Sequence, residues 1–350
     1  MRTLLLLLTA QILFLGSVLG QNNTETFSNP LLEMGPDPWM IYKEGYYFYT
    51  HTLQNRLEIR KTKNPIDLHN APRKLVWTAP DEGMYSAEIW APEIHYLDGE
   101  WYIYFAGDDG VNENHRMWVL VCDSQDPMTG NRSVKGKITN PDDHWAIDGS
   151  ILEHDGKRYF IWSGWETHTN IKQDIYISEM ENPWTLRGER VLLSSPTEPW
   201  ELNGLSPDSA YKSGDIFVNE GPQVLENNGN LFIIFSANGC WTDYYSLGVM
   251  KLREGGDVMR KDSWIKSDSA FFKTSEKNQV YAPGHNSFFK SPDGKEDWIL
   301  YHANPKPNQG CGNFRSPRAQ KIEWSENGYP YFGEPKSTDE RIALPSGVKK

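Results

Sequence analysis

One pattern of apolar and polar positions recurs along the chain. A short apolar strand leads into a tight polar turn that contains glycine, and a second strand rich in aromatic residues follows. The turn glycines are Gly45, Gly99, Gly156, Gly229 and Gly294. Asp-Gly and Asn-Gly tips between apolar runs are strong signals of β-hairpins. The pattern therefore predicts five hairpins, over residues 40–49, 93–105, 150–162, 223–235 and 287–301.

A third predicted strand follows each hairpin, at residues 57–60, 117–121, 174–178, 247–251 and 318–322. Units of this size, joined by loops of variable length, are typical of the blades of a β-propeller. We therefore predict an all-β fold, a five-bladed β-propeller, in a single domain over residues 21–350, with its folded part at about 28–345. A β-sandwich is the alternative, but it would need shorter and more even strand spacing.

The first 20 residues have the pattern of a secretory signal peptide, with cleavage expected before Gln21. Their apolar run is shorter than the roughly 20 residues that span a membrane, and no later segment approaches that length. The mature protein is expected to be soluble and secreted. Sequons at Asn22 and Asn131 are compatible with an exported glycoprotein.

The net charge argues against two classes of partner, and the cysteine content predicts which cysteines are oxidised. The formal net charge of −12 argues against nucleic acid and anionic membranes, whose binding needs a basic surface. The three cysteines are too few for a disulfide scaffold. Cys240 and Cys311 lie in loops beyond the second strands of the fourth and fifth units, so we expect them to form a disulfide after export. Cys122 ends a predicted strand and is expected to be a buried free thiol.

Three acidic residues lie at nearly the same number of positions before a hairpin glycine. Asp37 and Asp148 stand eight residues before their glycine, and Glu220 stands nine before, as does His285; Trp90 falls near this phase in the second unit. Because the first strand of each propeller blade lines the central axis, we expect the three acids to meet in one funnel as catalytic groups. Singly, each acid is more typical of a solvated strand end. The prolines on either side of Asp37 stiffen its backbone.

These segments resemble glycoside hydrolase family 43. The resemblance rests on Gly35-Pro-Asp-Pro-Trp39, Glu88-Ile-Trp-Ala-Pro-Glu-Ile-His95, Ala146-Ile-Asp-Gly149, Asn219-Glu-Gly-Pro222 and Tyr281-Ala-Pro-Gly-His-Asn286, in this order along nearly the whole mature chain. It implies hydrolysis with inversion, with Asp37 as general base, Glu220 as general acid, and Asp148 as the residue that orients the acid and modulates its pKa. An inverting hydrolase places its two carboxyl groups about 6.5–9.5 Å apart, which leaves room for water.

Other candidate residues follow from position or from the resemblance. Trp90 and Trp165 are interpreted as sugar platforms, with core packing as the alternative. Arg318 is interpreted as a residue that binds the substrate, because the resemblance implies that an arginine near this position contacts the bound sugar; a salt bridge within the acid cluster is the alternative, and the two roles are compatible. The resemblance also places His285 on the propeller axis beside a hydrated metal ion, usually calcium, although a buried histidine without a metal is equally compatible. No cofactor is expected for the chemistry itself.

The motif surroundings resemble family members that release α-L-arabinofuranose from arabinan or arabinose-decorated plant polysaccharide, and we expect an exo-acting monomer. β-Xylosidase and endo-α-1,5-arabinanase activities are the alternatives within the family; insertions at residues 107–116 and 164–172 favour a pocket over an open cleft. Outside this class, a non-catalytic sugar-binding propeller is the alternative, and the presence of all three acids argues against it. An invertase-type enzyme would carry a Trp-Met-Asn-Asp-Pro-Asn-Gly type motif, which is absent.

Overall fold

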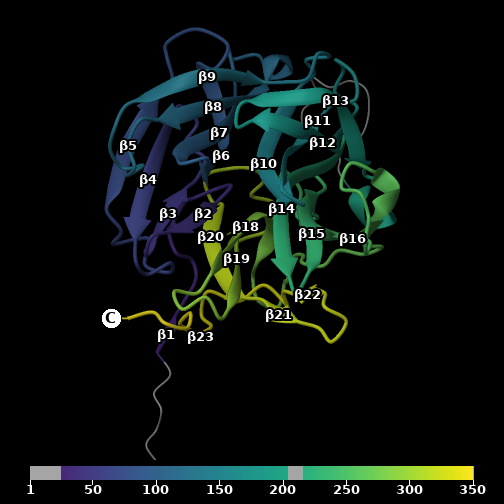
Figure 1. The fold of residues 1–350 in the computed structure, drawn as a ribbon. Helices are drawn as coiled ribbons and strands as arrows, with labels where there is room; N and C mark the ends of the chain where they lie inside the picture. Colours follow the sequence, from purple (N-terminus) through teal and green to yellow (C-terminus); the bar gives the residue numbers. More distant parts are fainter. Residues whose placement is uncertain (1–24, 204–215, 350) are drawn as a thin grey trace, which may run out of the picture.

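The computed structural model describes residues 25–203 and 216–349, and these form an all-β structure (Figure 1). Helical structure in these ranges is limited to three short 3₁₀ turns, η1 (Asn112–Asn114), η2 (Pro199–Glu201) and η3 (Lys261–Ser263). No helix of the described part has the length and apolar character needed to cross a membrane. The predicted signal peptide and the Asn22 sequon lie outside the described residues.

Most strands fall into five successive groups, in which neighbours along the chain pair antiparallel. The first group is β2 (Trp39–Lys43), β3 (Tyr46–Thr50), β4 (Arg56–Thr62) and β5 (Arg73–Thr78). The second is β6 (Ala87–Leu97), β7 (Glu100–Asp108), β8 (Arg116–Cys122) and β9 (Arg132–Ile138). The third is β10 (Ala146–His154), β11 (Lys157–Gly164), β12 (Lys172–Asn182) and β13 (Thr185–Ser194). The fourth is β14 (Phe217–Asn227), β15 (Asn230–Ala237), β16 (Ser246–Leu252) and β17 (Trp264–Lys266), and the fifth is β18 (Tyr281–Lys290), β19 (Asp297–Asn304) and β20 (Ser316–Lys321).

The five predicted hairpins are confirmed as the first two strands of each group. In the first four, a two-residue turn joins the strands, and both turn residues have a positive φ, as Asp98 (52°) and Gly99 (89°) show. This is the geometry of a type I′ turn, which matches the twist of the flanking strands and favours Asn, Asp and Gly. Local turn chemistry alone therefore specifies these hairpins.

The first strands of the groups pack on one another in order: β2 on β6, β6 on β10, β10 on β14, β14 on β18, and β18 on β2. Figure 1 shows these five strands toward the middle of the molecule, with the later strands of the first three groups farther out. Aromatic and aliphatic side chains fill the space between groups; Tyr104, Phe160 and Trp162, for example, share one buried cluster. Burial of these apolar surfaces supplies the main stabilisation of the arrangement.

The two ends of the described chain meet. β1 (Thr26–Phe27) pairs with β23 (Ile342–Ala343), so the N-terminal segment is held by the C-terminal one (Figure 1). A further short pair, β21 (Glu323–Trp324) and β22 (Pro330–Tyr331), follows the fifth group. Cys240 and Cys311 form a disulfide in the structure, the pair that the sequence predicted, and Cys122 is buried with a free thiol.

Candidate active site

The first strands share a local distortion at equivalent places. In β6, β10, β14 and β18 the pairing with the second strand shifts register at a β-bulge. At or beside these shifts, and just before β2 in the first group, each group has a residue with a left-handed backbone and φ between 42° and 56°: Asp37, Ala91, Asp148, Gly221 and His285, with Glu88 in β6 and Ala282 in β18 in addition. A bulge turns a side chain out of the regular alternation, and a left-handed non-glycine residue costs about 1–2 kcal/mol. Four of these five residues are not glycine, and strain repeated at their equivalent positions marks this ring as the candidate site.

The three predicted acids gather around His285. Its Nδ1 lies 3.5 Å from Oδ1 of Asp37 and 3.9 Å from Oδ2 of Asp148. One carboxylate oxygen of Asp148, one of Glu220 and a ring nitrogen of His285 all lie within 4.8 Å of one another. The three acidic residues are only 4–8% exposed. The fold thus brings acids from the first, third and fourth groups to a histidine of the fifth.

Positive and neutral donors surround Asp37. Nη1 of Arg315 donates to Oδ1 at 3.0 Å, and Oγ1 of Thr52 donates to Oδ2 at 2.6 Å. The backbone N–H of Asp37 donates to Nδ1 of His302 at 3.1 Å. Burial alone would raise the pKa of Asp37, but Arg315, His285, His302 and the Thr52 hydrogen bond outweigh it and hold that pKa well below its usual range. Asp37 is therefore an ionised acceptor.

The surroundings of Glu220 and Asp148 raise the pKa of these carboxyl groups, whereas those of Asp37 lower it. Burial, and the charge of Asp37, raise the pKa of Glu220 to about 7, although a hydrogen bond from the hydroxyl of Tyr245 to Oε1 (2.8 Å) opposes the rise. Burial and the charges of Glu220 and Asp37 also raise the pKa of Asp148 well above its usual range, against a hydrogen bond from the N–H of Gly221. Two neighbouring buried carboxyl groups resist double ionisation. The pair therefore keeps a proton near neutral pH.

Sequence reasoning missed the residues that contact these acids from other strands. Tyr245 and Arg315 each occupy the position just before a third strand, β16 and β20 respectively. His115 takes the same position before β8 and is fully buried beside Trp90. Aligning the third strands of the groups with one another would have shown that the residue just before the strand recurs as a site residue. No short motif singles out Thr52 or His302, which meet Asp37 only through the fold.

Of the two predicted platforms, Trp90 remains partly exposed. Its ring stacks on His115 at 4.1 Å, and its Nε1 donates to Oε1 of Gln54. Trp90 lies next to Ala91, which takes the position in the second group that Asp37 and Asp148 take in the first and third. This placement is compatible with a sugar platform, and that role stays a prediction.

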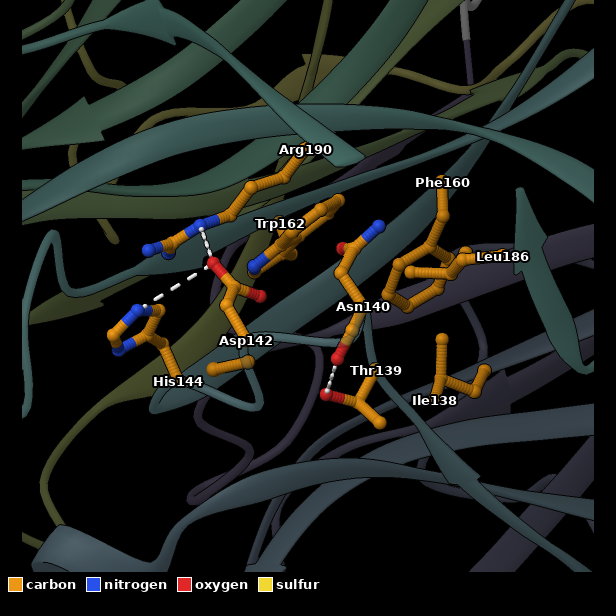
Figure 2. Close-up of a pocket in the computed structure, with 10 residues that line it drawn as sticks. Ile138, Thr139, Asn140, Asp142, His144, Phe160, Trp162, Leu186 and Arg190 are labelled. Carbon is orange, nitrogen blue, oxygen red and sulfur yellow. Dashed lines mark hydrogen bonds and ion pairs between the residues drawn. The ribbon is translucent and has the colours of Figure 1, made fainter. Parts of the chain in front are cut away.

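Trp165 is placed differently, and the interpretation as an exposed platform is wrong. The residue is 1% exposed and stacks on Trp145 at 4.7 Å with the rings nearly parallel. Nη1 of Arg190 donates to its carbonyl oxygen at 2.7 Å, which anchors the loop after β11. Figure 2 shows Arg190 bonded to Asp142 in the neighbouring cavity of about 10 Å³, room for about one water and not for a sugar. Core packing accounts for Trp165.

Arg318 is also not part of the acid cluster. It is fully buried, its Nε donates to Oγ of Ser316 at 3.4 Å, and it lines a separate cavity of about 410 Å³ together with Met34 and Phe314. None of the three acids lines that cavity. The salt bridge to the acids comes instead from Arg315, three residues earlier, because the chain enters β20 between the two arginines.

His285 fits a metal ion only in part. Calcium usually takes about six to eight oxygen ligands, whereas the group around His285 offers two carboxylate oxygens and one imidazole nitrogen. Both carboxylates belong to the candidate chemistry. These residues do not by themselves form a calcium site, and a hydrated ion beside His285 stays a prediction.

The sequence and the fold of this chain are both similar to those of known proteins. The sequence pattern that describes Glycosyl hydrolases family 43 matches residues 27–330. The chain is 36% identical to an extracellular exo-α-(1→5)-L-arabinofuranosidase of Streptomyces avermitilis, over 89% of this chain and 64% of that protein. It is 34% identical to a protein of the same name from Streptomyces chartreusis, over 79% of this chain and 82% of that one. A crystal structure of an α-L-arabinofuranosidase from Lactobacillus brevis superposes with a TM-score of 0.81 and 32% identity, covering 90% of this chain and 98% of that one.

Proposed function

Because this chain belongs to Glycosyl hydrolases family 43, we propose that it is a glycoside hydrolase that releases α-L-arabinofuranose from arabinan or arabinose-decorated plant polysaccharide. The chain spans somewhat less than two thirds of the Streptomyces avermitilis relative. The site supports the hydrolytic activity, and the names of the relatives support arabinofuranose as the sugar.

The observation that carries the proposal is the opposite surroundings of two buried carboxyl groups, Asp37 with Arg315 and Thr52 bonded to it and Glu220 with the neutral hydroxyl of Tyr245 bonded to it. Arg315 and Thr52 keep Asp37 ionised, while burial keeps a proton on Glu220 up to about pH 7. Hydrolysis of a glycosidic bond needs this pairing: one carboxylate takes a proton from water as it attacks the anomeric carbon, and one carboxylic acid gives a proton to the leaving oxygen. Asp37 is the proposed base and Glu220 the proposed acid. Asp148 holds the acid in place through the shared buried site.

Two loops support exo action, in which a pocket accepts the chain end. The carbonyl of Asn112, in the first insertion, accepts a hydrogen bond from Nε1 of Trp145 at 2.8 Å. Trp165, in the second insertion, stacks against the ring of the same Trp145. Trp145 immediately precedes β10, which carries Asp148, so both insertions are tied down beside the acids. Such fixed loops restrict access to one end of the site.

The proposal also covers the blade number, the domain organisation and the location of the protein. We propose that the five groups are the blades of a five-bladed propeller, which the closed order of first-strand contacts supports. Residues 21–350 would form one domain, monomeric and secreted after removal of residues 1–20; the word extracellular in the names of two relatives supports export. A hydrated ion beside His285 would be structural.

Substrate hydrolysis by the purified mature chain tests the proposal. We expect release of arabinose alone from linear α-1,5-arabinan, and faster cleavage of 4-nitrophenyl α-L-arabinofuranoside than of the β-D-xyloside. Oligosaccharide products would indicate endo action, and preference for the xyloside would indicate a β-xylosidase. Binding of arabinan without turnover would overturn the proposal in favour of a sugar-binding protein.

A further inference from the structure

Tyr245 occupies one carboxyl oxygen of Glu220 as a hydrogen-bond donor. The distance from its hydroxyl to Oε1 is 2.8 Å, and both residues are buried. Burial and the charge of Glu220 raise the pKa of the phenol well above its usual value, so it keeps its proton and remains a donor. A carboxylic acid whose Oε1 accepts a hydrogen bond carries its own proton on the other oxygen, Oε2.

Two neighbours, His302 and Gly284, fix the ring of Tyr245 by packing. It lies parallel to the ring of His302, with centroids 5.7 Å apart and an interplanar angle of 3°. On another side, Gly284 lies so close that a Cβ there would come within 2.2 Å of Cε1 of Tyr245. Because any larger residue at 284 would displace the ring, glycine at this position makes room for the phenol to reach Glu220.

The loop that ends in Tyr245 is cross-linked to the loop that ends in Arg315. Residues 238–245 join β15 to β16, and residues 305–315 join β19 to β20. The Cys240–Cys311 disulfide links the two loops, and both oxygens of the Asp243 carboxylate accept the N–H of Asn308 at 3.0 Å. Tyr245, at the end of the first loop, contacts the proposed acid. Arg315, at the end of the second loop, contacts the proposed base.

We propose that Tyr245 is a positioning residue for the general acid, held by the disulfide-braced loops; this inference rests on the proposed function. With Tyr245 donating to Oε1, the proton at Oε2 of Glu220 passes to the glycosidic oxygen as the bond from that oxygen to the anomeric carbon breaks and its electron pair stays on the oxygen. Water forms the new bond to the anomeric carbon, and Asp37 takes the proton of that water. Glu220 ends as a carboxylate, which the Tyr245 hydrogen bond stabilises.

Leaving-group dependence separates this role from a merely structural one. A sugar alkoxide needs a proton from Glu220 as it leaves, whereas 4-nitrophenolate needs little help. In Tyr245→Phe, which keeps the ring and its stack on His302, we expect kcat on linear α-1,5-arabinotriose to fall roughly ten- to a hundredfold. On 4-nitrophenyl α-L-arabinofuranoside we expect a loss of no more than about threefold. Equal losses on the two substrates would overturn the inference.

Matched variants complete the experiment. Tyr301→Phe removes another buried phenol hydroxyl, which donates to Gln320 in the fifth group, and should change neither rate. The double variant Cys240→Ser/Cys311→Ser keeps Tyr245 but removes the brace, and should show the same substrate bias in weaker form; absence of any bias there would overturn the part assigned to the disulfide. A wild-type protein that cleaves neither substrate would overturn the proposed function and this inference with it.

Discussion

The two ends of the inner strands follow different rules. At the hairpin ends, four of the five turns are two-residue loops with both residues at positive φ, and the turn glycines meet no neighbouring side chain. At the opposite ends four of these strands (β6, β10, β14 and β18) are bulged, and the left-handed residues there include Asp37, Asp148 and His285, which the surrounding structure buries. Positive φ therefore occurs at both ends, but a local turn sets it at the hairpin ends, whereas the site ends bury charged side chains among residues of several groups.

The hairpin end of each inner strand is structural, and the opposite end carries the groups of the proposed chemistry. Asp and Asn at a hairpin tip adopt positive φ at little cost, and their side chains lie at the surface, where Asp98 accepts two hydrogen bonds from Arg158. At the site end Asp37 carries a buried charge, and Glu220 and Asp148 have raised pKa values; both features destabilise the folded chain. Such costs persist only where neighbouring groups compensate them, as Arg315 and Thr52 do for Asp37. The comparison therefore predicts that chemically identical substitutions at the two ends have unequal effects.

The largest contrast is expected for an aspartate-to-asparagine change. Asp37→Asn keeps the shape of the side chain and its contact with Thr52 but removes the charge that accepts a proton from water. We expect the rate of arabinose release to fall by roughly 10²–10⁴. Asp98→Asn, at the hairpin tip of the second group, makes the same change at φ 52° and should leave the rate unchanged. Similar rates for Asp37→Asn and wild type would remove Asp37 from the chemistry.

A smaller contrast is expected between two glycines. Gly284→Ala places a methyl group against the ring of Tyr245, and such overpacking costs about 1–3 kcal/mol. Because the displaced phenol no longer reaches Glu220, kcat on arabino-oligosaccharides should fall together with the melting temperature. Parallel kinetics and thermal melts on the purified variant measure both.

Gly156→Ala is the matched change at a hairpin end. Its φ is +73°, and a Cβ there meets nothing within 4 Å. The left-handed backbone should cost about 1–2 kcal/mol of stability, while kcat stays at the wild-type value. A loss of activity in Gly156→Ala equal to that in Gly284→Ala would show that the two ends are not distinct.

The disulfide tests whether the site end needs covalent support. Loss of the Cys240–Cys311 bond, which closes a loop of 71 residues, should lower the free energy of unfolding by at most about 4.4 kcal/mol in the chain-entropy view. Denaturant unfolding of Cys240→Ser/Cys311→Ser measures this loss, with Cys122→Ser as the control that leaves the bond intact. An unchanged unfolding midpoint would show that noncovalent contacts alone hold the two loops.

Much of the fold was predictable because its signals are local. Asp98-Gly99 and Asn228-Gly229 mark their turns by residue type, and the five hairpins followed from such pairs. The meeting of Asp37, Asp148 and Glu220 was also predictable, because equal phase along repeated units places residues at one end of the inner strands. The Cys240–Cys311 pair followed from the same register of loops.

The environment of the acids was not predictable, because it depends on contacts between units. Nothing local distinguishes Tyr245, which is buried on Glu220, from Tyr244, which is 63% exposed. Arg315 and Arg318 lie three residues apart, and only the entry of the chain into β20 decides which one reaches Asp37. Trp165 was misplaced for a related reason: its partner Trp145 precedes a different strand, and only the fold brings the two rings together.

The most direct test of the account is the pH dependence of kcat/KM on a linear arabino-oligosaccharide. Glu220 must be protonated to act, and burial raises its pKa to about 7. Activity should therefore be present below that pH and fall about tenfold per pH unit above it. With Glu220→Gln, the residual rate should be low and should lose this alkaline limb. A limb that persists in Glu220→Gln, or a wild-type rate that stays constant through pH 9, would contradict the assignment of Glu220 as the general acid.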